Sequence, residues 1–156
     1  MSPTAFFILL VMVTVLSWLA RRLAQDRNVA ELIDLARQWN MHYSKGDRFR
    51  LADRVAQLLP IAGAADVRVE HLIYGNDAQG YRYVMTADFT EGVVRSKRRV
   101  RRVVALKERR YTGRASGWSE LLVAPHELPL VEQYKHLHEL QAEEPRTAAD
   151  SLAQAG

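Results

Sequence analysis

The first 20 residues contain no charged side chain, and no other feature of the sequence restricts the fold as strongly. Within this run, residues 5–20 (AFFILLVMVTVLSWLA) are interrupted only by Thr14 and Ser17. Twenty helical residues span about 30 Å, which matches the hydrocarbon core of a bilayer. A buried core helix is excluded, because the rest of the chain is too small to cover so uniformly apolar a surface. The run therefore predicts a single transmembrane helix within residues 1–24.

The residues that flank the apolar run indicate its orientation. Trp18 lies near the end of the run and Arg21 and Arg22 follow it, so we expect all three at a membrane interface. Positive charge is present only on this flank, which predicts that the rest of the chain lies on the cytoplasmic side of the cell inner membrane. A cleaved secretory signal is disfavoured, because no basic residue precedes the run and cleavage after Ala20 would place Trp18 at the −3 position.

The composition excludes several kinds of chemistry. The 156 residues include no cysteine, which removes disulfides, thiolate zinc sites, iron–sulfur clusters and cysteine nucleophiles. The five histidines are scattered without an HExxH motif, and GxSxG, GxGxxG and P-loop motifs are absent from the sequence. The sequence therefore predicts no metal site, no cofactor and no catalytic residue.

Two amphipathic helices are predicted after the leader. The first covers residues 28–40, with Asn28 as a candidate cap. Residues 21–27 contain no Gly or Pro, so this helix can also continue directly from the transmembrane helix. The second begins after Gly46 with Asp47 as its N-cap and ends at Pro60, which leaves residues 41–45 as a short link.

Alternating apolar and polar residues then predict an antiparallel meander of four strands with helices on one face. The first strand places Val67, Val69, His71 and Ile73 on one side and ends near Gly75. The others cover residues 81–90, 99–108 and 119–123. The strand over residues 81–90 either stops near Gly92 or bulges there and continues to Val94, and we expect the longer strand. A C-terminal helix opens at Pro129, and the composition of residues 144–156 predicts a disordered tail. The fold class is α+β, with one cytoplasmic domain over residues 25–143.

Three segments carry a resemblance to a known family: LARQWNMHYSKGDRFRLADRV, GAADVRVEHLIYG and YRYVMTADFTEGVVRSKRRVRRVV. Together they resemble a family of small uncharacterised bacterial single-pass membrane proteins, each with an N-terminal membrane helix and one α+β domain of unknown function. The similarity covers residues 35–106 and rests on the YSKGDRF link, the LIYG strand end and the basic strand. The resemblance implies this architecture and no activity, because none of these motifs is a catalytic signature.

Basic residues are concentrated in one predicted hairpin. Residues 95–114 contain ten basic residues and one acidic residue, whereas residues 127–156 contain six acidic residues and two basic ones. On a strand, Arg98 and Arg102 share one face and Arg99 and Arg101 share the other. The candidate residues for binding an anion or a lipid headgroup are Arg95, Lys97, Arg98, Arg99, Arg101 and Arg102.

This basic hairpin allows three interpretations. Its cations can keep an exposed sheet edge soluble, attract the domain to anionic lipid headgroups, or bind an acidic protein. Nucleic acid is disfavoured, because no aromatic residue interleaves residues 95–110 to provide a stacking platform.

We therefore expect a membrane-anchored, non-enzymatic binding or scaffolding domain. The alternative is a small-ligand carrier or a hydrolase-type enzyme with a pocket between the sheet and the helices. A deep polar pocket that contains two or more of His42, Asp66, His71 and Asp88 would favour this alternative.

Overall fold

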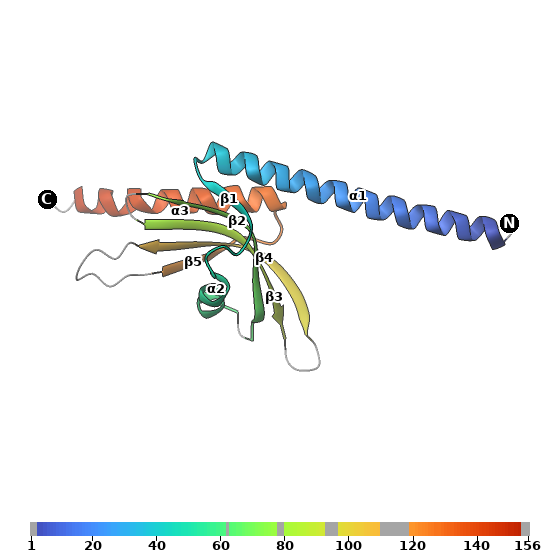
Figure 1. Ribbon diagram of the computed structural model, residues 1–156. Coiled ribbons are helices and arrows are strands. Elements are labelled where there is room, and N and C mark those ends of the chain that lie inside the picture. Colours follow the sequence, from blue (N-terminus) through green and yellow to red (C-terminus); the bar gives the residue numbers. More distant parts are fainter. Residues whose placement is uncertain (1–2, 62, 78–79, 93–96, 110–118, 154–156) are drawn as a thin grey trace.

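A computed structural model describes residues 3–61, 63–77, 80–92, 97–109 and 119–153. For residues 143–153 it describes the backbone alone. Five antiparallel strands form one sheet in the order β1-β2-β3-β4-β5, with helices on both of its faces (Figure 1). The elements are α1 (Pro3–Gln38), β1 (His42–Gly46), α2 (Ala52–Leu58), β2 (Ala65–Asn76), β3 (Gly80–Glu91), β4 (Arg98–Arg109), β5 (Ser119–Val123) and α3 (Leu130–Ala153). The predicted α+β class and the antiparallel meander are confirmed.

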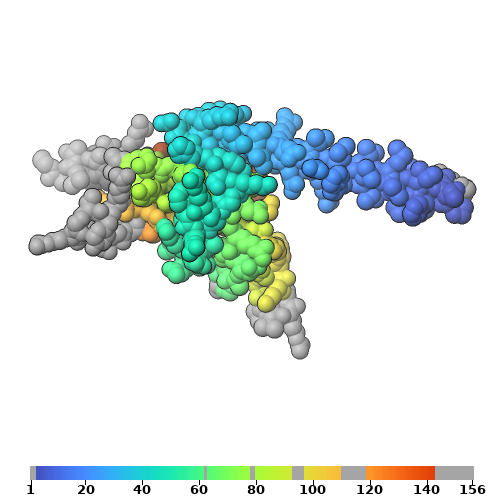
Figure 2. Space-filling view, viewed as in Figure 1, coloured from blue at the N-terminus to red at the C-terminus, as the bar shows by residue number. Residues whose placement is uncertain are grey.

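Helix α1 joins the apolar leader to the domain without a break. Its 36 residues include both the predicted transmembrane segment and the first predicted amphipathic helix, so Asn28 lies within the helix and does not cap it. Residues 3–27 are exposed, and the N-terminal half of α1 projects from the domain (Figure 2). Leu32, Leu35 and Ala36 are buried against the sheet. The helix is long and apolar enough to cross a membrane.

The fifth strand, β1, lies where the sequence predicts a link between two helices. Tyr43 pairs with Ile73 of β2, so residues that were expected to connect helices extend the sheet instead. The second predicted helix is correspondingly shorter and begins at Ala52. The carboxylate of Asp47 accepts hydrogen bonds from the backbone N–H groups of Leu51 (2.8 Å) and Ala52 (2.9 Å), so it does satisfy donors at the start of α2.

Helices cover both faces of the sheet, which corrects the expectation of helices on one face only. One core lies between α2 and the sheet and includes Val55, Leu72 and Phe89. The second lies between the sheet and the helices α1 and α3, and includes Leu32 and Tyr134. The central strands are buried on both faces, so their apolar and polar residues do not alternate as they do in a sheet with one wet face.

Strand β2 contains two irregularities that the alternating pattern does not predict. Its register against β3 shifts between Ala65 and Arg68 and again between Glu70 and Ile73, so two residues of β2 lie opposite one residue of β3 at each position. Asp66 and His71 have positive φ angles of 51° and 50° at these bulges. The second bulge sends Val69 and Ile73 into different cores, although they were expected on one face.

The structure also differs from the sequence prediction at the C-terminus. The backbone of α3 is helical to Ala153, whereas the composition of residues 144–156 predicts a disordered tail. The start of this helix agrees with the sequence, because α3 begins at Leu130, directly after Pro129.

Candidate functional site

The basic hairpin predicted from the sequence is formed by β3 and β4. Their last described pair is Glu91 and Arg98, and Arg95 lies outside the described residues. Lys97 and Arg98 are exposed, and Arg102 is half-buried. These three cations have no ion-pair partner within the described part of the chain. These three residues are therefore the cations of the hairpin that no described carboxylate neutralises.

Arg99 and Arg101 lie on the opposite face and are engaged by acidic side chains of β2 and β3. Arg99 donates from Nε to Oδ1 of Asp88 at 2.8 Å. Arg101 donates from Nη2 to Oε2 of Glu70 at 3.2 Å, and the same nitrogen lies 3.6 Å from Oδ2 of Asp88. Asp88 is buried, with an exposed fraction of 8%. These two arginines therefore compensate carboxylates of the sheet, a role that the sequence pattern did not indicate.

The three residues expected at a membrane interface lie together on α1. Trp18, Arg21 and Arg22 are exposed, and the guanidinium carbon of Arg22 lies 5.4 Å from the centre of the Trp18 ring. Residues four apart on a helix share one face, so this aromatic and cationic pair forms at the C-terminal end of the apolar run.

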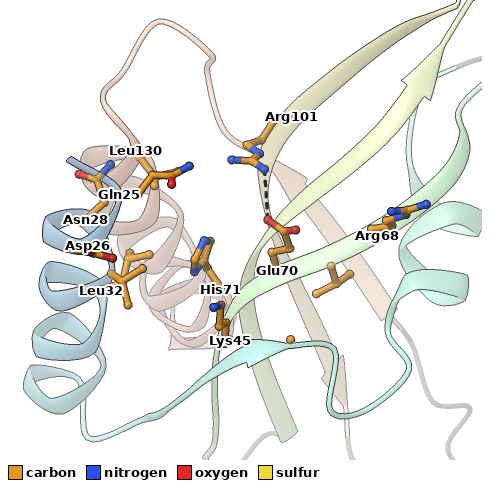
Figure 3. A pocket seen from close by; sticks show the side chains of 13 residues that line it. Gln25, Asp26, Asn28, Leu32, Lys45, Arg68, Glu70, His71, Arg101 and Leu130 are labelled. Atoms are coloured by element: carbon orange, nitrogen blue, oxygen red, sulfur yellow. Dashed lines mark hydrogen bonds and ion pairs between the residues drawn. The ribbon is translucent and has the colours of Figure 1, made fainter. Parts of the chain in front are cut away.

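A cleft of about 800 Å³ lies between α1 and the sheet, where the alternative interpretation of the sequence expects a pocket (Figure 3). One wall comes from α1 and consists of Gln25, Asp26, Asn28, Val29 and Leu32. The facing wall comes from β1, β2 and β4 and consists of Lys45, Gly46, Arg68, Val69, Glu70, His71 and Arg101, and Leu130 of α3 completes the lining. The lining contains three basic residues and two acidic ones.

The second bulge of β2 places Glu70 and His71 together on the cleft wall (Figure 3). In a regular strand, consecutive side chains point to opposite faces, so one of these two would lie on the other face of the sheet. The bulge needs a positive φ at His71, a conformation that is strained for a residue with a side chain. Tyr134 holds this backbone in place, because its hydroxyl donates to the His71 carbonyl oxygen at 2.7 Å.

Charged and aromatic groups from several strands surround the His71 ring. The Tyr43 hydroxyl of β1 lies 2.8 Å from Nδ1 of His71. Burial lowers the pKa of His71, and the positive charges of Arg101 on β4 and Lys45 on β1 lower this pKa further, while Glu70 acts in the opposite direction. The imidazole is therefore neutral at pH 7, and its Nε2 has no hydrogen-bond partner among the described residues.

A second partly buried histidine lies on α3, away from the cleft. The ring of His138 stacks on Trp39 with the ring centres 4.0 Å apart. Burial lowers the pKa of His138, Arg82 of β3 lowers this pKa further, and Glu139 acts in the opposite direction. Nδ1 of His138 is buried without a hydrogen-bond partner in the described structure.

These two histidines predict that the domain loses stability in mild acid. In the unfolded chain a histidine binds its proton near pH 6.5, whereas burial lowers the pKa of His71 and His138 in the folded domain. The unfolded state then binds more protons as the pH falls below 6.5, so the free energy of unfolding is highest above this pH and decreases toward the folded pKa values. Urea unfolding at pH 7.5 and pH 5 measures the difference.

Variants of the two histidines assign this effect. His71→Asn introduces a residue that also tolerates the positive φ at this position, and His138→Gln keeps a polar side chain that does not titrate. Each variant is expected to reduce the loss of stability between the two pH values. A loss that is unchanged in the double variant would show that other groups cause it.

The cleft contains one of the residues that were expected to line the pocket of a small-ligand carrier or an enzyme. No group of three or more metal-ligating side chains occurs in the part of the chain that the structure describes. Of the four residues that would have favoured a catalytic or carrier pocket, His71 lines the cleft, whereas His42, Asp66 and Asp88 are not among its lining residues. Comparison of the chain with protein-family models, curated proteins and solved structures finds no match. The family resemblance described above therefore remains a prediction.

Proposed function

We propose that this protein is a single-pass, membrane-anchored binding domain whose basic hairpin contacts anionic lipid headgroups on the cytoplasmic side of the inner membrane. The observation that supports this proposal is the position of the hairpin relative to α1. The paired ends of β3 and β4 curve toward the side of the domain from which α1 extends (Figure 1). If α1 crosses the bilayer, these ends face the same membrane surface, and the resemblance to single-pass membrane proteins agrees with this arrangement.

The charges of the hairpin support the same proposal. Lys97, Arg98 and Arg102 have no ion-pair partner within the described residues, so they remain available to an external anion. Each cation near an anionic leaflet adds to the attraction, and tethering by α1 keeps the domain close to that surface. An acidic protein partner would use the same cations. We favour the lipid surface over an acidic protein because the proposed anchor already holds the domain at that surface.

Flotation with vesicles tests the hairpin contact without the anchor. Residues 25–156 are expected to bind phosphatidylglycerol vesicles at low salt, to bind less at moderate salt, and not to bind phosphatidylcholine vesicles. Replacing Lys97, Arg98 and Arg102 with Ser is expected to weaken binding to the anionic vesicles on the order of a hundredfold. Arg99 and Arg101 stay unchanged, because their removal would leave Asp88 without its cationic partners.

A charge-matched variant serves as the control. Arg37, Arg48 and Arg109 are exposed and lie outside the free end of the hairpin, so replacing them with Ser removes the same charge elsewhere. This variant is expected to keep most of the vesicle binding. Equal losses in both variants would indicate attraction by net charge alone, and no binding by the parent chain would contradict the lipid contact. Circular dichroism spectra of all three chains establish that they are folded.

A further inference from the structure

The cleft beside α1 lies close to the membrane surface that the proposed anchor defines. Gln25 and Asp26 of its lining follow Arg21 by four and five residues in one continuous helix, which corresponds to about 6–8 Å along the axis. A headgroup layer extends about 5–8 Å beyond the hydrocarbon. The mouth of the cleft is therefore at the level where lipid headgroups end and the aqueous phase begins.

The sheet wall of the cleft carries hydrogen-bond donors and positive charge. Lys45, His71 and Arg101 come from three strands and lie along this wall, with His71 between the other two (Figure 3). The charges of Lys45 and Arg101 both lower the pKa of His71, so each of these two cations lies close enough to act on the imidazole. Lys45 is exposed and has no ion-pair partner among the described residues.

The acidic residues of the cleft engage Arg101, whereas Lys45 and Nε2 of His71 have no partner among the described residues. The Glu70 carboxylate accepts a hydrogen bond from Arg101 at 3.2 Å, which orients the guanidinium group along the wall. Asp26 belongs to the α1 wall, across the cleft from the sheet. A negative group is thus favoured beside Lys45 and His71, and a positive group against the helix.

The bulge at His71 is the second observation that points to a ligand. A strained backbone conformation persists only where the surrounding structure enforces it, and such residues concentrate at binding sites. Here the bulge turns the imidazole into the cleft, with Nδ1 held by Tyr43 and Nε2 left without a partner in the described structure. The ring is thus oriented to bond a group inside the cleft.

We infer that this cleft binds a phosphate ester, with the phosphate beside Lys45 and His71 on the sheet wall. The apolar side chains of Val29, Leu32 and Leu130 also line the cleft and can contact a glycerol or acyl portion of the same molecule. Two sources supply such a group, a phospholipid headgroup and a soluble phosphate ester. The position of the cleft at the membrane surface rests on the proposed function, whereas its phosphate chemistry does not.

A titration of the full chain tests the inference. The isotope-labelled protein is held in dodecyl maltoside micelles, which contain no phosphate, and its backbone amide signals are followed while a probe is added. The probes are glycerol 3-phosphate, dihexanoyl phosphatidylglycerol, and dihexanoylglycerol as a control without phosphate. We expect saturable shifts at Gly46, Glu70, His71 and Arg101 with at least one phosphate probe, and none at these positions with the control.

Two variants assign the contacts. Lys45→Gln removes the cation without shortening the side chain much, and it is expected to weaken binding roughly 10- to 100-fold, as the loss of a charge-assisted hydrogen bond does. His71→Asn keeps a residue that tolerates positive φ and is expected to weaken binding about tenfold. Lys135→Gln is the matched control, because this lysine lies on α3 outside the cleft lining. It is expected to bind as the parent chain does.

The outcomes separate the sources and the two proposals. Binding of the short-chain lipid alone assigns the cleft to a lipid headgroup, and equal binding of both phosphate probes assigns it to a soluble ester. Absence of saturable binding, or binding that Lys45→Gln and His71→Asn do not weaken, overturns the inference. The variant that lacks Lys97, Arg98 and Arg102 is expected to bind the probe normally. Its loss of vesicle binding therefore reports on the hairpin, independently of the cleft.

Discussion

Deletion of residues 1–24 is expected to move the protein from the membrane fraction to the soluble fraction when the membranes are washed at moderate salt, which weakens the remaining contact of the hairpin. Side chains 3–27 of α1 are exposed in the folded domain, so the apolar run contributes nothing to either core. Leu32, Leu35 and Ala36, which α1 does contribute, remain in the shortened chain. The full chain should resist extraction by alkaline carbonate, because a transmembrane helix inserts in an effectively irreversible way.

The same preparation decides between an anchor and a cleaved signal. An anchor predicts that the membrane fraction contains the intact chain of 156 residues, and a cleaved signal predicts a chain shortened near Ala20. Intact protein in the soluble fraction would contradict both. Because the sequence has no cysteine, single cysteines introduced by Ser2→Cys and Ser119→Cys can be labelled selectively from outside. Labelling of Ser119→Cys, but not Ser2→Cys, would reverse the proposed orientation.

Replacing Tyr134 with Ala is expected to cost about 3–5 kcal/mol of unfolding free energy, the largest effect of a single substitution that we predict. This tyrosine is fully buried between α3 and the sheet. Its hydroxyl donates to the His71 carbonyl at 2.7 Å and lies 2.8 Å from the Thr86 hydroxyl, which then acts as the donor. The ring therefore fills the second core while the hydroxyl fixes the bulge of β2.

A second variant separates the ring from the hydroxyl. Tyr134→Phe keeps the ring but leaves Thr86 and the His71 carbonyl without this partner, so we expect a cost of about 1–3 kcal/mol. Tyr74→Phe is the control, because its hydroxyl accepts one long hydrogen bond of 3.3 Å from the exposed Arg48. This control should change stability by less than about 0.5 kcal/mol. Urea unfolding of residues 25–156, followed by tryptophan fluorescence, measures all three.

Comparable losses for Tyr134→Phe and Tyr134→Ala would show that the hydroxyl network dominates over packing. No loss for Tyr134→Phe would show that the bulge does not depend on this network. In the second case His71 would be held by Tyr43 and by the strands alone.

The elements that the sequence predicted correctly are those with strong local signals. The hairpin of β2 and β3 has alternating residues on both sides of a loop rich in turn-forming residues, and β4 continues the alternation. The continuity of α1 was left open by residues 21–27, which contain no helix breaker. These features depend on neighbours along the chain, so one sequence is enough to reveal them.

The parts that the sequence missed depend on distant residues. Residues 42–46 have no apolar alternation, and they form a strand because the edge of β2 offers hydrogen bonds to Tyr43 and its neighbours. The helices on both faces were missed because Thr86 and Asp88 look like solvent-facing positions, although both are buried. Tyr134, which bonds Thr86, lies 48 residues away in the sequence.

The candidate site was predicted only in part. The concentration of charge identified the hairpin, but alternation could not show that Arg99 and Arg101 are occupied by Asp88 and Glu70. A pocket between the sheet and the helices was expected only under the alternative interpretation, and most of its lining residues were not predicted, because they come from five separate elements and a bulge at His71. No local signal in residues 70–72 distinguishes a bulged strand from a regular one.

The unbroken course of α1 has a mechanical consequence. A helix of 36 residues is about 54 Å long, and no Gly or Pro interrupts it between the apolar run and the contacts of Leu32 and Leu35 with the sheet. Any tilt of its first half is therefore transmitted to the domain as a rotation. Because tilt adjusts to bilayer thickness, a thinner membrane would swing the ends of β3 and β4 relative to the surface. If α1 crosses the bilayer as proposed, the thickness of the membrane therefore sets the height of the hairpin above its surface.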